Sequence, residues 1–353
     1  MNYLTPNHRL ALLMHDGTDN SGGKTGLALL RYSPLPIVAV IDRRRAGGNL
    51  AQITGIPREV PIVASLQSAL AYDPTVLAIG IAPSGGALPD PWYQEVKAAV
   101  AAGLSVVNGL HRPLGQDPAL PLTQPDQWIW DVRQEPPGLS VGMARARTLA
   151  CRRVLAVGTD MAVGKMSANL ELHRAARARG LRSKVIATGQ TNLMLGDDGV
   201  ALDAVRVDFA AGAVEQVVMR YGPDHDILFI EGQGSLFNPA STATLPLMRG
   251  SQPTHLILAH RAGQTHIKNC PEIPIPPLPE AIRVCETLVT AGGAFLAAQV
   301  VGVALNTHHL GEQDAIAAIQ STQTQTGLPC TDVLRFGPDP LLAALLATPM
   351  PKG

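Results

Sequence analysis

Short apolar runs alternate with helix-forming segments along the whole chain, and this alternation constrains the fold more than any other feature. In the first half the runs span residues 10–14, 37–41, 61–64, 76–81 and 105–108. In the second half they span residues 154–157, 184–188, 227–230, 255–259 and 300–305. Uninterrupted runs of Val, Ile and Leu, followed closely by Gly, Asp or Ser, are typical of parallel strands covered on both faces. The sequence therefore predicts an α/β fold.

The segments between these runs predict helices that cross from one strand to the next. They span residues 65–71, 91–102, 165–179, 204–221, 280–291 and 312–326. Strands separated by helices are the signature of βαβ units, so both halves are expected to be doubly wound. Ligands of such sheets bind beyond the carboxyl ends of the strands. In the second half, the loops to inspect therefore follow residues 157, 188, 230, 259 and 305.

The length of 353 residues suits two domains, each with a full core of its own. Residues 111–139 are dense in Pro, Gln, Asp and Trp without a sustained period, which predicts a long irregular connection. We place the domain boundary near its end. The predictions are a Rossmann-like domain over residues 1–148 and a P-loop NTPase-like domain with a doubly wound parallel sheet over residues 149–353.

Composition excludes several classes of protein. Lys and Arg number 28 and Asp and Glu number 28, so the chain lacks the basic surplus of most nucleic-acid binders. The four cysteines have no metal-ligand spacing, and no metal is expected. The longest apolar stretch, residues 291–305, is broken by glycines and is too short to span a bilayer. We expect a cytoplasmic homo-oligomer that acts on a small molecule and binds neither nucleic acid nor membrane.

The strongest motif is an apolar strand, a glycine-bounded loop that ends in Gly-Lys, and a helix. Backbone N–H groups of such a loop and the helix N-terminus surround a phosphate, and the lysine neutralises it. A plain phosphate loop has four residues before Gly-Lys and then a Ser or Thr that holds Mg²⁺. Here five residues intervene, Met166 follows Lys165, and Ser167 comes one position late. The predicted cofactor-binding residues are Gly158, Thr159, Asp160, Ala162, Val163, Gly164, Lys165, Met166 and Ser167.

A similar string lies upstream, at residues 17–25, with the same spacing and Thr25 directly after Lys24. Two prolines shorten the helix that follows, so a polar turn and a second anion site both remain open. Asp42 ends a predicted strand, where a dinucleotide fold would hold a ribose hydroxyl. No GxGxxG precedes it, and bound NAD is not expected.

Polar residues follow the other strands of the second half. Glu231 follows one strand and begins Glu-Gly-Gln-Gly-Ser, which suits a base or a residue that holds a metal through water. Thr188 and Gln190 follow another strand and suit hydroxyl and amide contacts to a ligand. The loop of residues 260–268 contains two His, an Arg and a Lys, which favours a ligand with carboxylate or phosphate groups.

With these loops in view, the sequence resembles the DUF1611 family, whose better-understood members look like D-glutamate N-acetyltransferases. The matching segments are residues 24–25, 29–32, 82–86, 109–111, 158–167, 187–191, 207–209, 231–236 and 304–306. The second half is also similar to dethiobiotin synthetase, an ATP-dependent carboxylase with the same loop spacing. That enzyme type has Thr where this chain has Met166, which favours acyl transfer over Mg-ATP chemistry.

The resemblance implies an N-acetyltransferase that uses acetyl-CoA and acts on an acidic amino acid, with D-glutamate expected first. The loop would hold the phosphates of CoA without a metal, and Asp208 or Glu231 would take the proton of the amine. The predicted substrate-binding residues are Thr188, Gln190, Gln233, Arg261 and Lys268. Two alternatives stay open: an ATP-dependent ligase or kinase with Mg²⁺, and a non-catalytic nucleotide-binding regulator.

Overall fold

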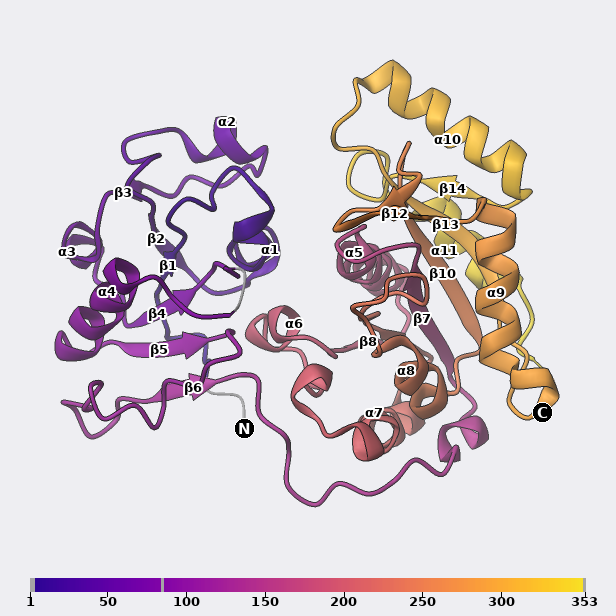
Figure 1. Ribbon diagram of the computed structural model, residues 1–353, viewed down its shortest axis with the longest axis horizontal. Coiled ribbons are helices and arrows are strands. Elements are labelled where there is room, and N and C mark those ends of the chain that lie inside the picture. Colours follow the sequence, from indigo (N-terminus) through magenta and orange to yellow (C-terminus); the bar gives the residue numbers. More distant parts are fainter. Residues whose placement is uncertain (1–3, 84–85, 352–353) are drawn as a thin grey trace. The chain divides into compact units, whose positions relative to one another are not determined.

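The computed structural model describes residues 4–83 and 86–351, so two residues of the matching segment 82–86 lie outside it. The chain forms two compact units (Figure 1). Unit 1 contains residues 1–134 and 190–197, and unit 2 contains residues 135–189 and 198–353. Each unit has a parallel six-stranded sheet of its own. The predicted α/β class, with one parallel sheet in each half of the chain, is confirmed.

Unit 1 has a sheet with the strand order β3-β2-β1-β4-β5-β6. Its strands are β1 (Leu10–Leu13), β2 (Ile37–Ile41), β3 (Ile62–Val63), β4 (Val76–Ile79), β5 (Ser105–Asn108) and β6 (Ile129–Asp131). Its helices are α1 (Lys24–Tyr32), α2 (Leu50–Thr54), α3 (Leu66–Ala69), α4 (Asp90–Ala101) and α6 (Gln190–Met194).

Both faces of this sheet are buried, as the uninterrupted apolar runs predict. Leu10 and Leu12 of β1 pack in one core with residues of α1 and α6. The alternate residues, Ala11 and Leu13, pack in a second core with residues of α3 and α4. Successive side chains of a strand point to opposite faces, so one short strand contributes to both layers.

Unit 2 has the strand order β14-β13-β10-β7-β9-β8. Its strands are β7 (Arg152–Gly158), β8 (Ser183–Ile186), β9 (Ile227–Ile230), β10 (His255–Arg261), β13 (Gln299–Asn306) and β14 (Cys330–Thr331). The pair β11 (His266–Ile267) and β12 (Cys270–Pro274) is antiparallel and separate. The helices are α5 (Lys165–Ala178), α7 (Val207–Tyr221), α8 (Thr244–Ser251), α9 (Leu278–Thr290), α10 (Glu312–Thr326) and α11 (Asp339–Ala347).

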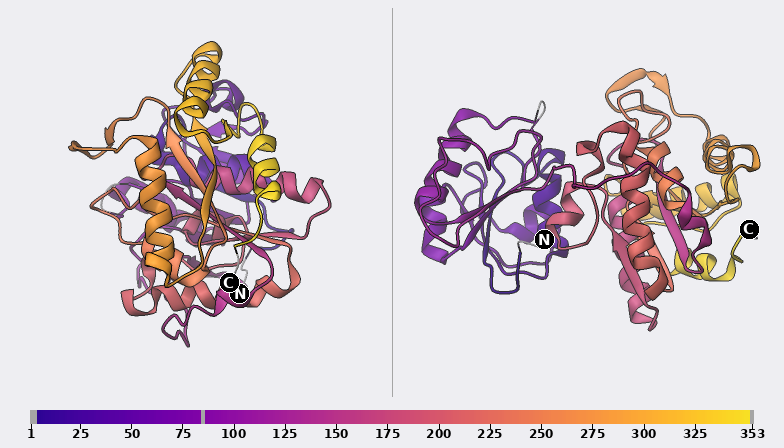
Figure 2. Two further views of the ribbon diagram at one scale, coloured as in Figure 1. Left: turned by 90° about the vertical axis from the view of Figure 1, so that its right-hand side faces the viewer. Right: turned by 90° about the horizontal axis from the view of Figure 1, so that it is seen from below.

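Helices cover both faces of the second sheet as well (Figure 2). Leu155 and Val157 of β7 share a core with residues of α7, α8 and α9. On the other face α5 contacts β7, β8 and β9, and α11 contacts α5 and β13. This arrangement places the loop after β7 at the carboxyl edge of the sheet, between β10 and β9.

The structure corrects one expected feature and divides the chain differently from the expected boundary. Residues 129–131, inside the predicted irregular connection, form β6, which pairs with β5. The units divide after residue 134 rather than near 148, because Glu135 bonds to Arg206 and the backbone of Arg145 bonds to Glu215, both in unit 2. Among the described residues, no helix is long and apolar enough to cross a membrane.

Candidate anion-binding site of the second unit

The loop between β7 and α5 is the strand, loop and helix that the sequence predicts. Ala162 and Gly164 have positive φ angles of 56° and 113°, which curl the loop before α5 begins at Lys165. Lys165 is buried, and its Nζ atom donates a hydrogen bond of 2.8 Å to the carbonyl oxygen of Asp160. A free helix N-terminus and a lysine ammonium therefore meet at one curled loop, which is the arrangement that favours phosphate.

The carboxylate of Asp160 ties this loop to its neighbours. Oδ1 accepts hydrogen bonds from Met161 N and Asn238 Nδ2, both at 2.7 Å. Oδ2 accepts from Gln264 Nε2 at 2.7 Å and Lys268 N at 2.9 Å. Burial alone would raise the pKa of Asp160, but these hydrogen bonds outweigh it and hold the pKa below its ordinary value. Asp160 is therefore an anchor for three loops.

A second contact holds the start of the loop against β10. The hydroxyl of Thr159 lies 2.8 Å from Nδ1 of His260, and both side chains are buried. Burial lowers the pKa of His260 to about 4. His260 is therefore neutral at pH 7, and the density of basic residues in its loop overstates the positive charge there.

Glu231 lies at the carboxyl end of β9, the strand next to β7. Its Oε2 atom accepts backbone hydrogen bonds from Thr188 at 2.9 Å and Gly189 at 3.0 Å. The Thr188 hydroxyl donates to the backbone oxygen of Glu231 at 2.7 Å. Thr188 thus fixes the acidic residue, while Glu231 itself is 4% exposed and held in one orientation.

Glycines after β9 allow this acidic loop to approach the lysine. A Cβ atom on Gly232 would lie 1.7 Å from the carbonyl oxygen of Ala156 and 2.8 Å from Cδ of Lys165. Gln233 Nε2 lies close to Gly189, only 2.2 Å from the position that a Cβ atom would occupy there. The loop after β9 therefore packs directly on β7 and on the stem of Lys165.

The other predicted residues of the loop and its neighbours differ in burial. Met166 and Ser167 are half-buried in the first turn of α5, and Val163 is buried. Arg261 ends β10 and is half-exposed, and Lys268 carries an exposed side chain on the neighbouring loop.

No hydrogen bond within the described residues of unit 2 brings the other two predicted residues into this group. Asp208 is exposed in the first turn of α7, and no hydrogen bond joins it to the loop among the residues that the structure describes. Gln190 begins α6 in unit 1, where its side chain packs near Gly109.

Sequence reasoning missed two residues that complete the site. Asn238 and Gln264 donate to Asp160, and both lie in loops after strands next to β7. A search of every strand-end loop for amide donors would have found them. Within residues 4–83 and 86–351, no group of three or more His, Cys, Asp or Glu side chains is placed to hold a metal ion.

The fold and this loop define a protein with a Rossmann-like unit and a P-loop unit. The family model "Domain of unknown function (DUF1611_C) P-loop domain" matches residues 140–342, and the model "DUF1611_N Rossmann-like domain" matches residues 43–135. The chain therefore belongs to the DUF1611 family.

The relatives cover between 76% and 97% of the chain. A protein named D-glutamate N-acetyltransferase from Tritonibacter scottomollicae is 35% identical over 339 residues, which cover 95% of this chain and 98% of that protein. A protein of the same name from Pseudoalteromonas sp is 33% identical over 76% of this chain and 80% of its own length. A crystal structure of a DUF1611 family protein from Anabaena variabilis is 65% identical, with a TM-score of 0.95, and covers 97% of this chain and 100% of that one.

Proposed function

We propose that the protein is an N-acetyltransferase that moves the acetyl group of acetyl-CoA to the amine of an acidic amino acid, D-glutamate first among them. The observation that carries this proposal is a phosphate loop in which Met166 replaces the Mg²⁺-binding hydroxyl. CoA carries a pyrophosphate and a ribose phosphate, so the loop can bind it without a metal. The name of the two relatives supports the reaction class.

In this proposal the loop amides and Lys165 hold a phosphate of CoA. Phosphate would take the place of the Asp160 carbonyl, which now receives the hydrogen bond from Lys165 Nζ. The ammonium group stays within the loop in either case, so little side-chain motion is needed. Lys165 is thus a residue of binding rather than of bond breaking.

Acetyl transfer forms a bond between the substrate nitrogen and the thioester carbonyl carbon. The carbon–sulfur bond breaks, and the proton lost by the amine ends on the sulfur of CoA. We assign the removal of that proton to Glu231, because two backbone donors fix its carboxylate beside the loop that holds Lys165. Asp208 is the second candidate. Arg261 and Lys268 are assigned to the carboxylates of the acceptor, and no ion pair already occupies either side chain within the described residues.

The test is the release of free CoA thiol from acetyl-CoA in EDTA, with D-glutamate, L-glutamate and D-aspartate as acceptors. We expect acceptor-dependent release with D-glutamate. Glu231→Gln should lower kcat by roughly 10²- to 10⁴-fold, the usual contribution of a general base. Asp208→Asn should change kcat by less than about threefold. No thiol release with any of the three acceptors would refute the proposal, and the opposite ranking of the variants would move the base to Asp208.

A functional complex in this proposal is a homo-oligomer that acts on small molecules and does not bind nucleic acid. The equal numbers of acidic and basic residues support the proposal that the protein does not bind nucleic acid. Sedimentation of the purified chain tests the proposed homo-oligomer, and a monomer at working concentration would contradict it.

A further inference from the structure

The sheet of unit 1 has a topological switch point that the proposed acetyl transfer does not use. Its order, β3-β2-β1-β4-β5-β6, places β1 and β4 side by side at the centre. The chain proceeds outward to β2 and β3 on one side and to β5 and β6 on the other. In open α/β sheets ligands bind beyond the carboxyl ends of the strands at such a point.

Two glycines, Gly23 and Gly26, bring the start of α1 close to these strand ends. A Cβ atom on Gly23 would lie 2.1 Å from the carbonyl oxygen of Gly17, and one on Gly26 would lie 2.4 Å from Sδ of Met14. The amide of Gly26 donates to the carbonyl oxygen of Gly80, after β4, at 2.7 Å. In nucleotide-binding βαβ units, glycines allow the tight loop and the close packing of the helix on the sheet.

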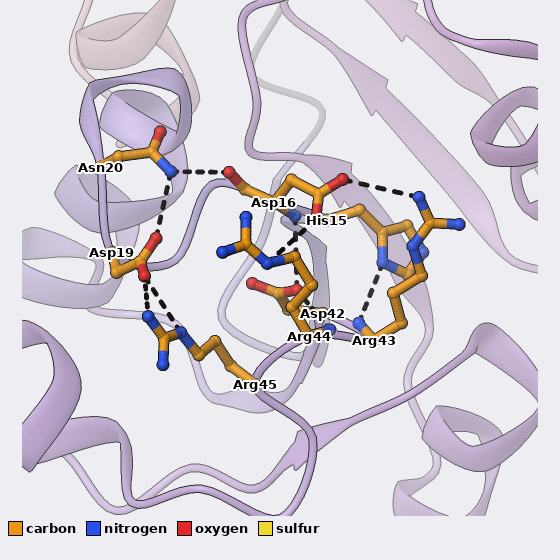
Figure 3. A network of polar contacts seen from close by, with 8 residues as sticks. All are labelled: His15, Asp16, Asp19, Asn20, Asp42, Arg43, Arg44 and Arg45. Atoms are coloured by element: carbon orange, nitrogen blue, oxygen red, sulfur yellow. Dashed lines mark hydrogen bonds and ion pairs between the residues drawn. The ribbon is translucent and has the colours of Figure 1, made fainter.

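Two polar atoms at this edge are buried without a hydrogen-bond partner among the residues that the structure describes. They are Oδ2 of Asp42, which follows β2, and Oγ1 of Thr18, which lies in the loop after β1. Both residues are 0% exposed. The other oxygen of Asp42 accepts from the backbone of Arg44 at 3.0 Å and of Asp16 at 3.3 Å, so the carboxylate is fixed (Figure 3). Buried polar groups are nearly always paired, so these two atoms indicate a missing donor.

Charges around Asp42 are arranged so that an anion is not repelled. The carboxylates of Asp16 and Asp19 pair with the arginines that follow β2: Arg45 bonds to Asp19, and Arg43 and Arg44 lie 3.5 and 3.7 Å from Asp16 (Figure 3). The Arg43 and Arg44 side chains are 54% and 59% exposed, so their guanidinium groups are accessible from solvent while they neutralise Asp16.

Basic groups also gather at the start of α1. Lys24 is the first residue of this helix and is exposed. Arg133 Nε donates a hydrogen bond of 2.8 Å to the carbonyl oxygen of Gly109, two residues before His111. Burial lowers the pKa of His111, and the charges of Arg133 and Lys24 lower it further, so the positive charge here comes from Lys24 and Arg133. A phosphate at the helix N-terminus would meet both the dipole and these side chains.

We propose that this edge of unit 1 binds a ribonucleotide whose ribose carries a free 2′,3′-diol. Asp42 accepts hydrogen bonds from the hydroxyls, and the first turn of α1 with the Lys24 ammonium holds the phosphate. CoA is excluded from this site, because a phosphate replaces one of the two ribose hydroxyls that would donate hydrogen bonds to Asp42. The site is thus separate in chemistry from the proposed CoA site of unit 2.

The experiment is calorimetric titration of ADP, 2′-deoxy-ADP and CoA into the full chain with Lys165→Ala, which disables the loop of unit 2. We expect ADP to bind, 2′-deoxy-ADP and CoA to bind at least about tenfold more weakly, and Asp42→Asn to weaken ADP by at least about tenfold. Asp73→Asn is the matched control, because Asp73 is exposed and precedes β4 at the other edge of the sheet. It should leave the ADP affinity unchanged.

Lys24→Ala keeps the test decisive if Asp42→Asn fails to fold, since Lys24 is exposed, and it should weaken ADP by about tenfold. Equal affinity for ADP and its 2′-deoxy form, or no ADP binding at all, would overturn the proposal. The acetyl transfer assay reads unit 2 independently, so either proposal can fail alone.

Discussion

Asp160→Asn tests whether one buried carboxylate holds the loops of the anion site together. Each oxygen of Asp160 accepts two hydrogen bonds. An asparagine in either amide orientation leaves two donors facing its NH₂ group, and each unsatisfied buried donor costs about 1–3 kcal/mol. Gln264 also donates to the carbonyl oxygen of His266 and keeps that partner. We therefore expect a loss of about 3 kcal/mol in the free energy of unfolding of unit 2.

The assay must report on unit 2 alone. All three tryptophans, Trp92, Trp128 and Trp130, lie in unit 1, so tryptophan fluorescence follows the wrong unit. Amide hydrogen exchange of peptides from β7 and β10, measured across a urea series, gives the opening free energy where Asp160 acts.

Asp339→Asn is the matched control in the same unit. Asp339 has a side chain that is 72% exposed and pairs with Arg179, so its loss should cost about 0–1 kcal/mol. Since hydrogen bonds hold the pKa of Asp160 below its ordinary value, the stability that Asp160 contributes is present above the ordinary pKa and is lost as pH falls through the lowered pKa. Equal protection in the two variants at pH 7 would refute the anchoring role.

Three further predictions concern unit 2. Burial lowers the pKa of His173, His255 and His260 to about 4, so protonation of these histidines favours the unfolded chain. The free energy of unfolding should therefore be highest above pH 6.5 and fall towards pH 4, by up to about 1.4 kcal/mol per pH unit for each histidine. In a pH series of urea melts, His260→Gln should reduce this slope. An unchanged slope in His260→Gln would contradict the contribution of His260 to the pH dependence. Gly232→Ala should weaken CoA binding by at least about tenfold in calorimetry, because its Cβ would meet Ala156 and Lys165. Gly311→Ala, whose Cβ would lie 3.8 Å from the nearest atom, should leave the CoA affinity unchanged. Equal effects of the two variants would contradict the close packing of Gly232 on Lys165. Met166→Thr should change the affinity for CoA in EDTA by less than about threefold, since no metal takes part, and a large loss would show that Met166 itself contacts the ligand.

The fold was predictable because its strands are fully buried. Runs such as 37–41 and 227–230 coincide with β2 and β9, since both faces of each strand need apolar side chains. β6 escaped prediction because it is an edge strand of three residues with only partly buried Ile129 and Trp130. The insertion of α6 into unit 1 depends on contacts such as the 3.2 Å approach of Thr25 and Thr191, which are far apart in sequence.

The site was predictable where backbone geometry determines it. The curled loop and Lys165 follow from glycine spacing and the strand–helix pattern. The partners of Asp160 were not predictable, because Asn238 and Gln264 come from loops whose positions only the strand order fixes. Thr188 was predicted as a ligand contact, yet its hydroxyl bonds to the backbone of Glu231, a pairing that pattern alone does not reveal.

The central claim is that the loop between β7 and α5 holds the phosphates of CoA without a metal. Calorimetric titration of CoA into the full chain in EDTA tests it most directly, with Lys165→Ala beside it. We predict that CoA binds in EDTA and that Lys165→Ala weakens this binding at least about tenfold. Binding of ATP only in the presence of Mg²⁺, with no binding of CoA, would contradict it.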